Sequence, residues 1–243
     1  MEPTSPLVTA EWLLEHLDLP NLVILDAGYF LPAQKRNARQ EYLEKHIPGA
    51  RFFDIEAIAD TANALPHMLP SKEFFDESAG QMGIGNHTLV VVYDNNDFMA
   101  SARVWWTFRV FGHERVRVLD GGLHYWLAQG FPVRSDTQPI KAQSFQGTYH
   151  PSLVRNLDAI LDQLDSPQAQ LIDARPPGRF SGDEPEPRTG LRSGHIPGSR
   201  NLFFKRLIDD ITHTLRPAQE LEQIFRDAGI DPFQPVTATC GSG

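Results

Sequence analysis

The sequence has little cysteine, few basic residues and no long apolar run. One cysteine occurs among 243 residues, which excludes an intramolecular disulfide and a zinc site built from several thiolates. Acidic residues outnumber basic ones by 31 to 22, giving a formal charge of −9. A general nucleic-acid binder needs clustered Lys and Arg instead, because it must neutralise phosphates.

The location is restricted by two further absences. No stretch approaches the roughly 18 consecutive apolar residues of a membrane-spanning helix. The first residues, Met1–Pro6, lack the basic start and apolar run of a secretory signal. A lone thiol is also typical of a reducing compartment. We therefore expect a soluble, cytoplasmic protein with no nucleic-acid partner and no membrane partner.

Signals for helices and strands alternate along the chain. Thr9 and Ser71 are residue types that cap helices, and each precedes apolar residues at helical spacing. The apolar runs 22–25 and 89–93 are typical of buried strands, and 100–111 of a further helix. This alternation predicts the α/β class, with a mostly parallel sheet flanked by helices in each domain.

An internal repeat indicates that one domain occurs twice. A strand-like segment ending in Asp-Ala, a His-Ile-Pro-Gly segment and the end of a later strand all recur. Their offsets, 173 − 26 = 147, 195 − 46 = 149 and 240 − 94 = 146, are nearly constant, as in a tandem duplication. The matched landmarks are Val23–Ala27 with Leu171–Arg175, His46–Ala50 with His195–Ser199, and Asp94 with Cys240.

The repeat predicts the domain organisation. We expect a first domain over 1–134, a linker over 135–149 and a second domain over 150–243. The linker mixes Pro, Gly, Gln and Ser without periodicity. The first copy continues well beyond Asp94, whereas only three residues follow Cys240. By this template the second domain is C-terminally incomplete and lacks a helix, a strand and a final helix.

Cys240 is a candidate nucleophile because of where it lies. It follows a predicted strand directly, and catalytic groups of α/β sheets gather at the carboxyl ends of strands. The glycines of Cys240–Gly243 allow a tight turn whose N–H groups can face an anion. A packed structural cysteine explains these four residues equally well. The first copy has Asp94 at the matching position. This difference is expected if one copy is catalytically active and the other has lost its activity.

Other candidate residues have simpler explanations beside the functional ones. His46 and His195 occur in both copies, which favours a structural role over chemistry. Arg179 and Arg188 flank an acidic, proline-rich insert, and they are either solvated or a fork for a carboxylate. His67 lies between two prolines, with Glu56 upstream, and is either an ordinary loop histidine or part of a site.

Taken together, these residues resemble the tandem-domain rhodanese superfamily, and within it the bacterial type of 3-mercaptopyruvate sulfurtransferase. The resemblance extends from Trp12 to Gly243, and in this family the first domain is catalytically silent. The most specific motifs are Phe52–Glu56, Pro66–Pro70, Asp120–Leu123, Glu184–Arg188 and Cys240–Gly243.

The resemblance implies a role for each residue that matches the family's motifs. Cys240 is the nucleophile that becomes a persulfide, and the loop residues after it hold that sulfur. Two arginines bind the carboxylate and keto group of the substrate, and three side chains relay protons. Glu56 stands where some relatives have Asp. The implied loop residues are Gly241, Ser242 and Gly243, the arginines are Arg179 and Arg188, and the relay is His67, Ser242 and Glu56.

The implied activity is transfer of sulfur from 3-mercaptopyruvate to an acceptor, with release of pyruvate. The acceptor is cyanide, a small thiol or a thioredoxin-like protein, and the reaction uses no metal and no organic cofactor. One alternative is a thiosulfate sulfurtransferase, and another is a phosphatase of the related Cys-loop type. A third is a non-catalytic rhodanese-like binding module, if the chain truly ends at Gly243.

Overall fold

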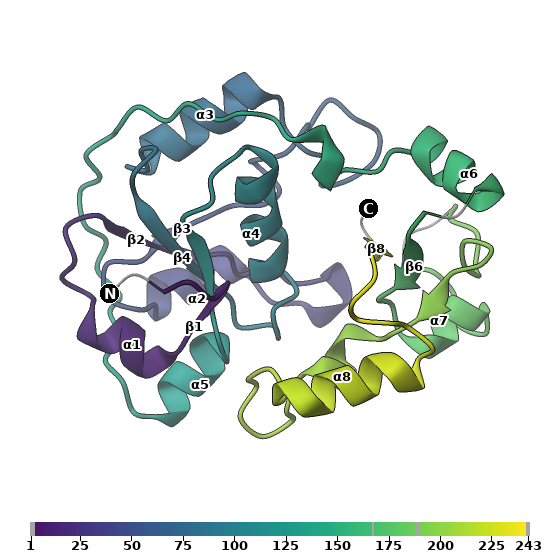
Figure 1. Ribbon diagram of the computed structural model, residues 1–243. Helices are drawn as coiled ribbons and strands as arrows, with labels where there is room; N and C mark the ends of the chain where they lie inside the picture. Colours follow the sequence, from purple (N-terminus) through teal and green to yellow (C-terminus); the bar gives the residue numbers. More distant parts are fainter. Residues whose placement is uncertain (1–2, 167, 188–189, 242–243) are drawn as a thin grey trace. The chain divides into compact units, whose positions relative to one another are not determined.

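Every pairing between the named strands is parallel, which confirms the α/β class (Figure 1). The computed structural model describes residues 3–166, 168–187 and 190–241. Contacts within it define two units, each with its own sheet. Unit 1 comprises Met1–Leu153 with Asp210–Thr214, and unit 2 comprises Val154–Asp209 with Leu215–Gly243.

The sheet of unit 1 has the strand order β1-β5-β4-β2-β3. All five residues of β4 are buried, as in a strand whose sheet is covered on both faces. Val90 and Val92 point into one apolar cluster, whereas Val91 and Tyr93 point into the other. The strands are β1 Leu7–Val8, β2 Leu22–Asp26, β3 Arg51–Phe52, β4 Leu89–Tyr93 and β5 Val116–Leu119.

Helices cover both faces of this sheet. Side chains of α3 and α4 pack into the first cluster, and those of α1, α2 and α5 into the second. The predicted caps are confirmed, since Thr9 Oγ1 accepts from Trp12 N–H and Ser71 Oγ from Phe74 N–H. The helices are α1 Ala10–Glu15, α2 Ala38–Glu44, α3 Lys72–Gln81, α4 Ser101–Val110 and α5 Gly122–Ala128, with short 3-10 turns at Pro32–Gln34 and Pro151–Leu153.

Unit 2 has a smaller sheet of order β7-β6-β8. Its apolar cluster is built on Ile172, Leu202 and Ile230, against which residues of α8 pack. Among the described residues, β8 is an edge strand, whereas its counterpart β4 is central. The elements are α6 Leu157–Asp165, β6 Gln170–Asp173, α7 Pro177–Ser181, β7 Arg200–Asn201, a 3-10 turn Phe204–Leu207, α8 Ala218–Asp227 and β8 Val236–Thr239.

The strand register confirms the equivalence of the two copies. In unit 1, Asp26 of β2 pairs with Tyr93 of β4. In unit 2, Asp173 of β6 pairs with Thr239 of β8. The residues that follow, Asp94 and Cys240, therefore occupy the same position at the carboxyl edge of each sheet.

The segment 135–149 contains no helix or strand, but it is packed against unit 1. Phe145 is buried in the first apolar cluster. The N–H of Gln143 donates to Gly80 O, and that of Thr148 to Phe111 O. A composition without periodicity is thus compatible with a fixed path along the surface of a domain.

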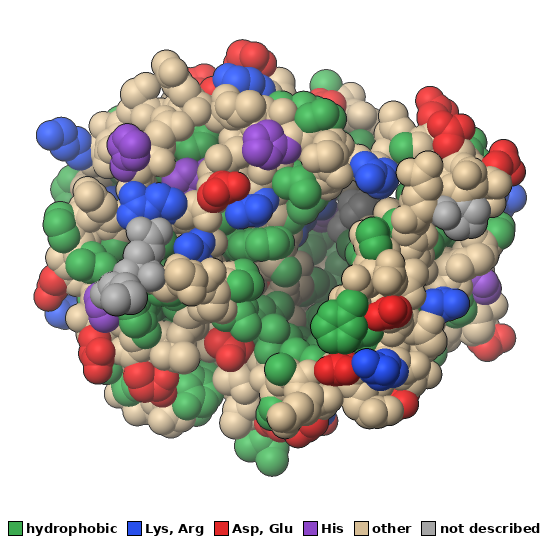
Figure 2. All heavy atoms as spheres, viewed as in Figure 1, with side chains coloured by type: hydrophobic (Ala, Val, Ile, Leu, Met, Phe, Trp, Pro, Cys, Tyr) green, Lys and Arg blue, Asp and Glu red, His purple; other side chains and the backbone are tan. Residues whose placement is uncertain are grey.

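Two properties of the described residues concern membranes and charged partners: helix hydrophobicity and the distribution of surface charge. No helix among the described residues is long and apolar enough to cross a membrane. On the face in view, acidic and basic side chains are interspersed (Figure 2).

Asp26 makes the stability of unit 1 depend on pH. Burial raises the pKa of this carboxyl from 3.8 to about 6, although Gly28 N–H donates to it at 2.8 Å. Because the folded pKa exceeds the unfolded one, the stabilisation is complete below about pH 4 and is lost as pH rises through about 6. As pH rises from about 4 to about 6, the free energy of unfolding of the wild type should fall by on the order of 1–3 kcal/mol relative to that of Asp26→Asn.

Urea unfolding followed by tryptophan fluorescence measures this loss, because all four tryptophans lie in unit 1. Asp18→Asn is the control, since Asp18 is exposed in the same unit. Equal pH dependence in wild type and Asp26→Asn would contradict the expectation.

Candidate active site

The carboxyl ends of three strands of unit 2 meet at one edge. Asp173 ends β6 and pairs in register with Asn201 of β7 and Thr239 of β8. The Asn201 amide donates to Asp173 O and to Arg175 O, at 3.1 and 2.8 Å. Cys240 follows β8 immediately, and its side chain is exposed. The cysteine therefore lies where open α/β sheets bind their ligands.

Four side chains of alternating charge run along this edge. The Asp173 carboxylate, which is buried, accepts from the Arg175 guanidinium at 2.6–3.1 Å. Arg175 donates onward to Glu186 Oε1 at 2.8 Å. Glu186 in turn accepts from Arg179, at 3.3 Å to Nε and 2.5 Å to Nη2. The planar guanidinium of Arg179 is thus held by two bonds in a fixed orientation.

The electrostatics favour the charged forms of Glu186 and Arg175. The hydrogen bond from Arg179 lowers the pKa of Glu186, against the opposing effect of burial. The hydrogen bond with Asp173 raises the pKa of Arg175. The Glu186 side chain is only 4% exposed. A buried charge is costly unless it is paired, and Arg175 and Arg179 both pair with this carboxylate.

Arg179 lies directly against the loop that follows Cys240. A Cβ placed on Gly241 would lie 2.7 Å from Nη2 and 3.1 Å from Nη1 of Arg179. A side chain at position 241 would therefore require the guanidinium to shift, and the hydrogen bonds from Arg179 to Glu186 oppose that shift. Nη1 has no hydrogen-bond partner among the described residues, so it can donate to a bound anion. The structure therefore brings Cys240, Gly241 and Arg179 together.

In unit 1, the position that matches Cys240 is occupied by Asp94, whose carboxylate accepts hydrogen bonds from the backbone of the same unit. Asp94, which is 2% exposed, accepts two backbone N–H groups from the loop before α4 and two from the start of that helix. A negative charge at a helix N-terminus is stabilised by the helix dipole. The donors are Asn96 and Phe98 to Oδ1, at 3.0 and 3.2 Å, and Ala100 and Ser101 to Oδ2, at 3.0 and 2.8 Å.

The two copies also share a turn with different side chains. Gly28 N–H donates to Asp26 at 2.8 Å, and Arg175 N–H donates to Asp173 at 2.9 Å. Arg175 then folds its side chain back onto the same aspartate, whereas Gly28 has none. The sheet edge of unit 2 thus gains a positive side chain that unit 1 lacks.

His67 and Glu56 lie in unit 1 and face each other. His67 Nε2 is 3.9 Å from Glu56 Oε1, and the histidine side chain is 6% exposed. Its backbone has φ +58°, an uncommon conformation for histidine. Tyr29 packs edge-on against the ring, and Arg103 donates to the His67 carbonyl. His67 is thus a buried histidine in a left-handed conformation beside Glu56, and a role in a site stays a prediction.

The repeated histidines have structural contacts, as their recurrence predicts. His46 is buried, with Nδ1 2.7 Å from Tyr42 O and Nε2 3.2 Å from Asp136 O. His195 stacks on Phe180, and its Nδ1 lies 2.7 Å from Phe180 O. Each Nδ1 therefore holds a proton and donates to a backbone carbonyl.

Three predicted site residues cannot be placed, and two residues of the site were not predicted. Arg188, Ser242 and Gly243 lie outside the described residues. Sequence reasoning missed Glu186, which accepts from Arg179, and Arg175, which donates to Glu186. The signal was the Glu-Pro-Glu-Pro insert beside the arginine, but spacing alone does not tell which carboxylate turns inward.

These features place the chain among duplicated α/β proteins in which one copy keeps a cysteine where the other has an acid. The chain belongs to the family of the rhodanese-like domain, whose model matches residues 9–129 and 156–243. The 3-mercaptopyruvate sulfurtransferase of Rattus norvegicus is 42% identical, covering 98% of this chain and 82% of that protein. The thiosulfate sulfurtransferase of the same organism is 43% identical with the same coverage.

A solved structure agrees with this membership. SseA from Escherichia coli, described for the fold and catalytic mechanism of 3-mercaptopyruvate sulfotransferases, has a TM-score of 0.89 and 37% identity. The match covers 99% of this chain and 90% of that chain.

Replacing Asp94 should destabilise unit 1. Asp94→Ala leaves four N–H groups without their acceptor and removes a charge at the start of α4. We expect a loss of about 2–4 kcal/mol in the free energy of unfolding, and a smaller loss for Asp94→Asn. Urea unfolding followed by tryptophan fluorescence measures it. A loss no greater than that of the exposed control Asp136→Ala would show that the carboxylate is dispensable.

Proposed function

We propose that the protein is a sulfurtransferase that takes sulfur from 3-mercaptopyruvate onto Cys240 and passes it to an acceptor. The observation that carries this proposal is the position of Arg179, braced by Glu186 and lying against the loop that begins at Cys240. A nucleophile and a carboxylate-binding group on one edge are what a small thiol-bearing acid requires.

The reaction has two transfers. The Cys240 thiolate attacks the sulfur of 3-mercaptopyruvate, so an S–S bond forms as the C–S bond breaks. The electron pair of that bond leaves with the enolate of pyruvate, which then takes up a proton. A thiolate of the acceptor next attacks the outer sulfur, giving a new persulfide and returning the Cys240 thiolate. This covalent sequence is ping-pong.

The charge balance at the edge supports an organic donor. The charges of Arg175 and Arg179 are balanced by Asp173 and Glu186, so these four described side chains carry no net charge together. Thiosulfate, a small dianion, suits a loop with uncompensated cations. The carboxylate and keto oxygen of 3-mercaptopyruvate need only the open Nη1 edge of Arg179 and the second arginine, Arg188, assigned by resemblance.

The proton-transfer roles of His67, Ser242 and Glu56 are part of the proposal. The close approach of His67 to Glu56 supports it for that pair, and Ser242 is assigned by resemblance alone. Gly241 and Gly243 would provide loop N–H groups for the sulfur. The acceptor would be a small thiol, a thioredoxin-like protein or cyanide. We propose the cytoplasm as the location, because a persulfide-forming thiol functions in a reducing compartment.

Changing Cys240 to Ser in the full-length protein should abolish turnover. A serine hydroxyl cannot form a persulfide, so we expect pyruvate release from 3-mercaptopyruvate to fall below about 10⁻³ of wild type. With thiosulfate assayed in parallel through thiocyanate formation, kcat/KM should be at least about tenfold higher for 3-mercaptopyruvate.

Three results distinguish the alternatives. Pyruvate release that persists in Cys240→Ser would contradict the assignment of the nucleophile. A preference for thiosulfate would favour the second candidate function. Failure of wild type with both donors would favour a binding module.

Glu186→Gln tests whether the ion pair between Glu186 and Arg179 contributes to binding of 3-mercaptopyruvate. The amide keeps the shape but loses the charge that holds both arginines. We expect KM for 3-mercaptopyruvate to rise about tenfold with a smaller change in kcat, because Glu186 is a positioning residue for binding. Steady-state kinetics measure the split, with Glu184→Gln as the control because Glu184 is exposed on the same insert. Unchanged KM in a folded Glu186→Gln protein would contradict the role.

A further inference from the structure

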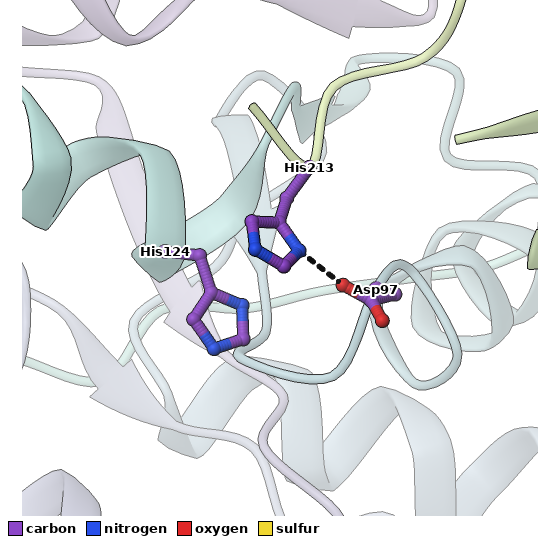
Figure 3. A group of neighbouring side chains, drawn as sticks. All are labelled: Asp97, His124 and His213. Atoms are coloured by element: carbon purple, nitrogen blue, oxygen red, sulfur yellow. Dashed lines mark hydrogen bonds and ion pairs between the residues drawn. The ribbon is translucent and has the colours of Figure 1, made fainter. Parts of the chain in front are cut away.

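Three side chains of the kind that bind metals meet in unit 1, although they are far apart in the sequence (Figure 3). Asp97 lies in the loop between β4 and α4, His124 in α5, and His213 in the segment Asp210–Thr214. One donor atom of each lies within 4.8 Å of the other two. His213 Nδ1 is 2.8 Å from Asp97 Oδ1, and the two imidazole rings stack with centroids 4.5 Å apart.

These side chains line a small hollow at the carboxyl edge of the sheet. Asp94, Ser101 and Gly122 also line it. The hollow is too narrow for an organic ligand, whose pockets usually begin at about 300 Å³. Its size therefore favours a single ion bound directly by the side chains.

The backbone around the hollow brings the three side chains together. Asp97 and His213 have φ of +55° and +59°, a conformation held by the surrounding structure. Gly122 lets α5 approach the Asp94 loop, since a Cβ there would lie 2.4 Å from Asp94 O. The side chain of Asp94 is itself saturated by four N–H groups, which leaves Asp97 as the carboxylate that faces the histidines.

The donor set suits a divalent transition metal. Two imidazoles and one carboxylate, with positions left for water, match the preferences of Zn²⁺ and its neighbours. Metal–donor bonds of about 2.0–2.2 Å put donor atoms roughly 3.3–3.5 Å apart, so the Asp97–His213 pair needs to open only slightly.

We propose that Asp97, His124 and His213 bind one divalent transition-metal ion, best matched by Zn²⁺, at the edge where the first copy has no cysteine. The ion would replace the hydrogen bond between His213 and Asp97 and release the Nδ1 proton to solvent. It would tie the segment 210–214 to the Asp94 loop and to α5. The sulfurtransferase chemistry of Cys240 needs no metal, so this proposal stands independently of that function.

Zn²⁺ titration of the full-length, chelator-stripped protein tests the proposal. The background is Cys240→Ser, which removes the competing thiol. We expect one Zn²⁺ per chain by calorimetry, with a dissociation constant of about 10 µM or less, and a rise in melting temperature with Zn²⁺. Co²⁺ should give visible d–d absorption, and no thiolate charge-transfer band should appear with Cys240 present.

Variants assign the ligands. In the same background, Asp97→Asn, His124→Gln and His213→Asn should each weaken Zn²⁺ binding at least about tenfold. Asn tolerates the left-handed backbone at positions 97 and 213, and Gln suits a helix at 124. His87→Gln is the matched control, because His87 is exposed in unit 1.

Two results would overturn the proposal. One is the absence of Zn²⁺ binding in the Cys240→Ser background. The other is unchanged affinity in His124→Gln and His213→Asn, with their fold verified by circular dichroism and tryptophan fluorescence.

Discussion

Parallel register is the constraint on which both halves of this protein depend. It sets Asp26 opposite Tyr93 and Asp173 opposite Thr239, so the next residue in each copy arrives at the same sheet edge. Parallel strands gather their carboxyl ends there, and the N-terminus of a following helix favours negative charge. The first copy satisfies its own N–H groups with the Asp94 carboxylate, whereas the second presents a thiol at that place.

The two copies also show how a buried carboxylate depends on its partners. Asp26 and Asp173 end equivalent strands and make the same turn to the residue two positions on. Asp26 has glycine there, and burial raises its pKa. Asp173 has Arg175 there, and the resulting ion pair begins a chain of alternating charges that ends at Arg179. A glycine or an arginine at this equivalent position thus separates a carboxyl whose pKa is raised by burial from one that forms an ion pair.

Much of the fold was predictable because its signals are local. The caps at Thr9 and Ser71 and the apolar run of β4 are read within a few residues, and the duplication is read by comparing such short segments at a constant offset. The same reasoning did not reveal that the segment 135–149 packs on unit 1, because its contacts are single side chains and backbone bonds without period. Nor did it identify Glu186 as the partner of Arg179, or bring Asp97, His124 and His213 together.

The sequence by itself determined the α/β class, the duplication, and the placement of Cys240 directly after a strand. Periodicity and capping residues are properties of neighbouring positions, and repeat offsets compare short segments, so all of them can be read from the sequence alone. Only the tertiary structure decided that Arg179 is braced by Glu186 against Gly241, and that two distant histidines meet one aspartate. Such contacts depend on the path of the chain between elements, which brings together side chains that no spacing rule relates.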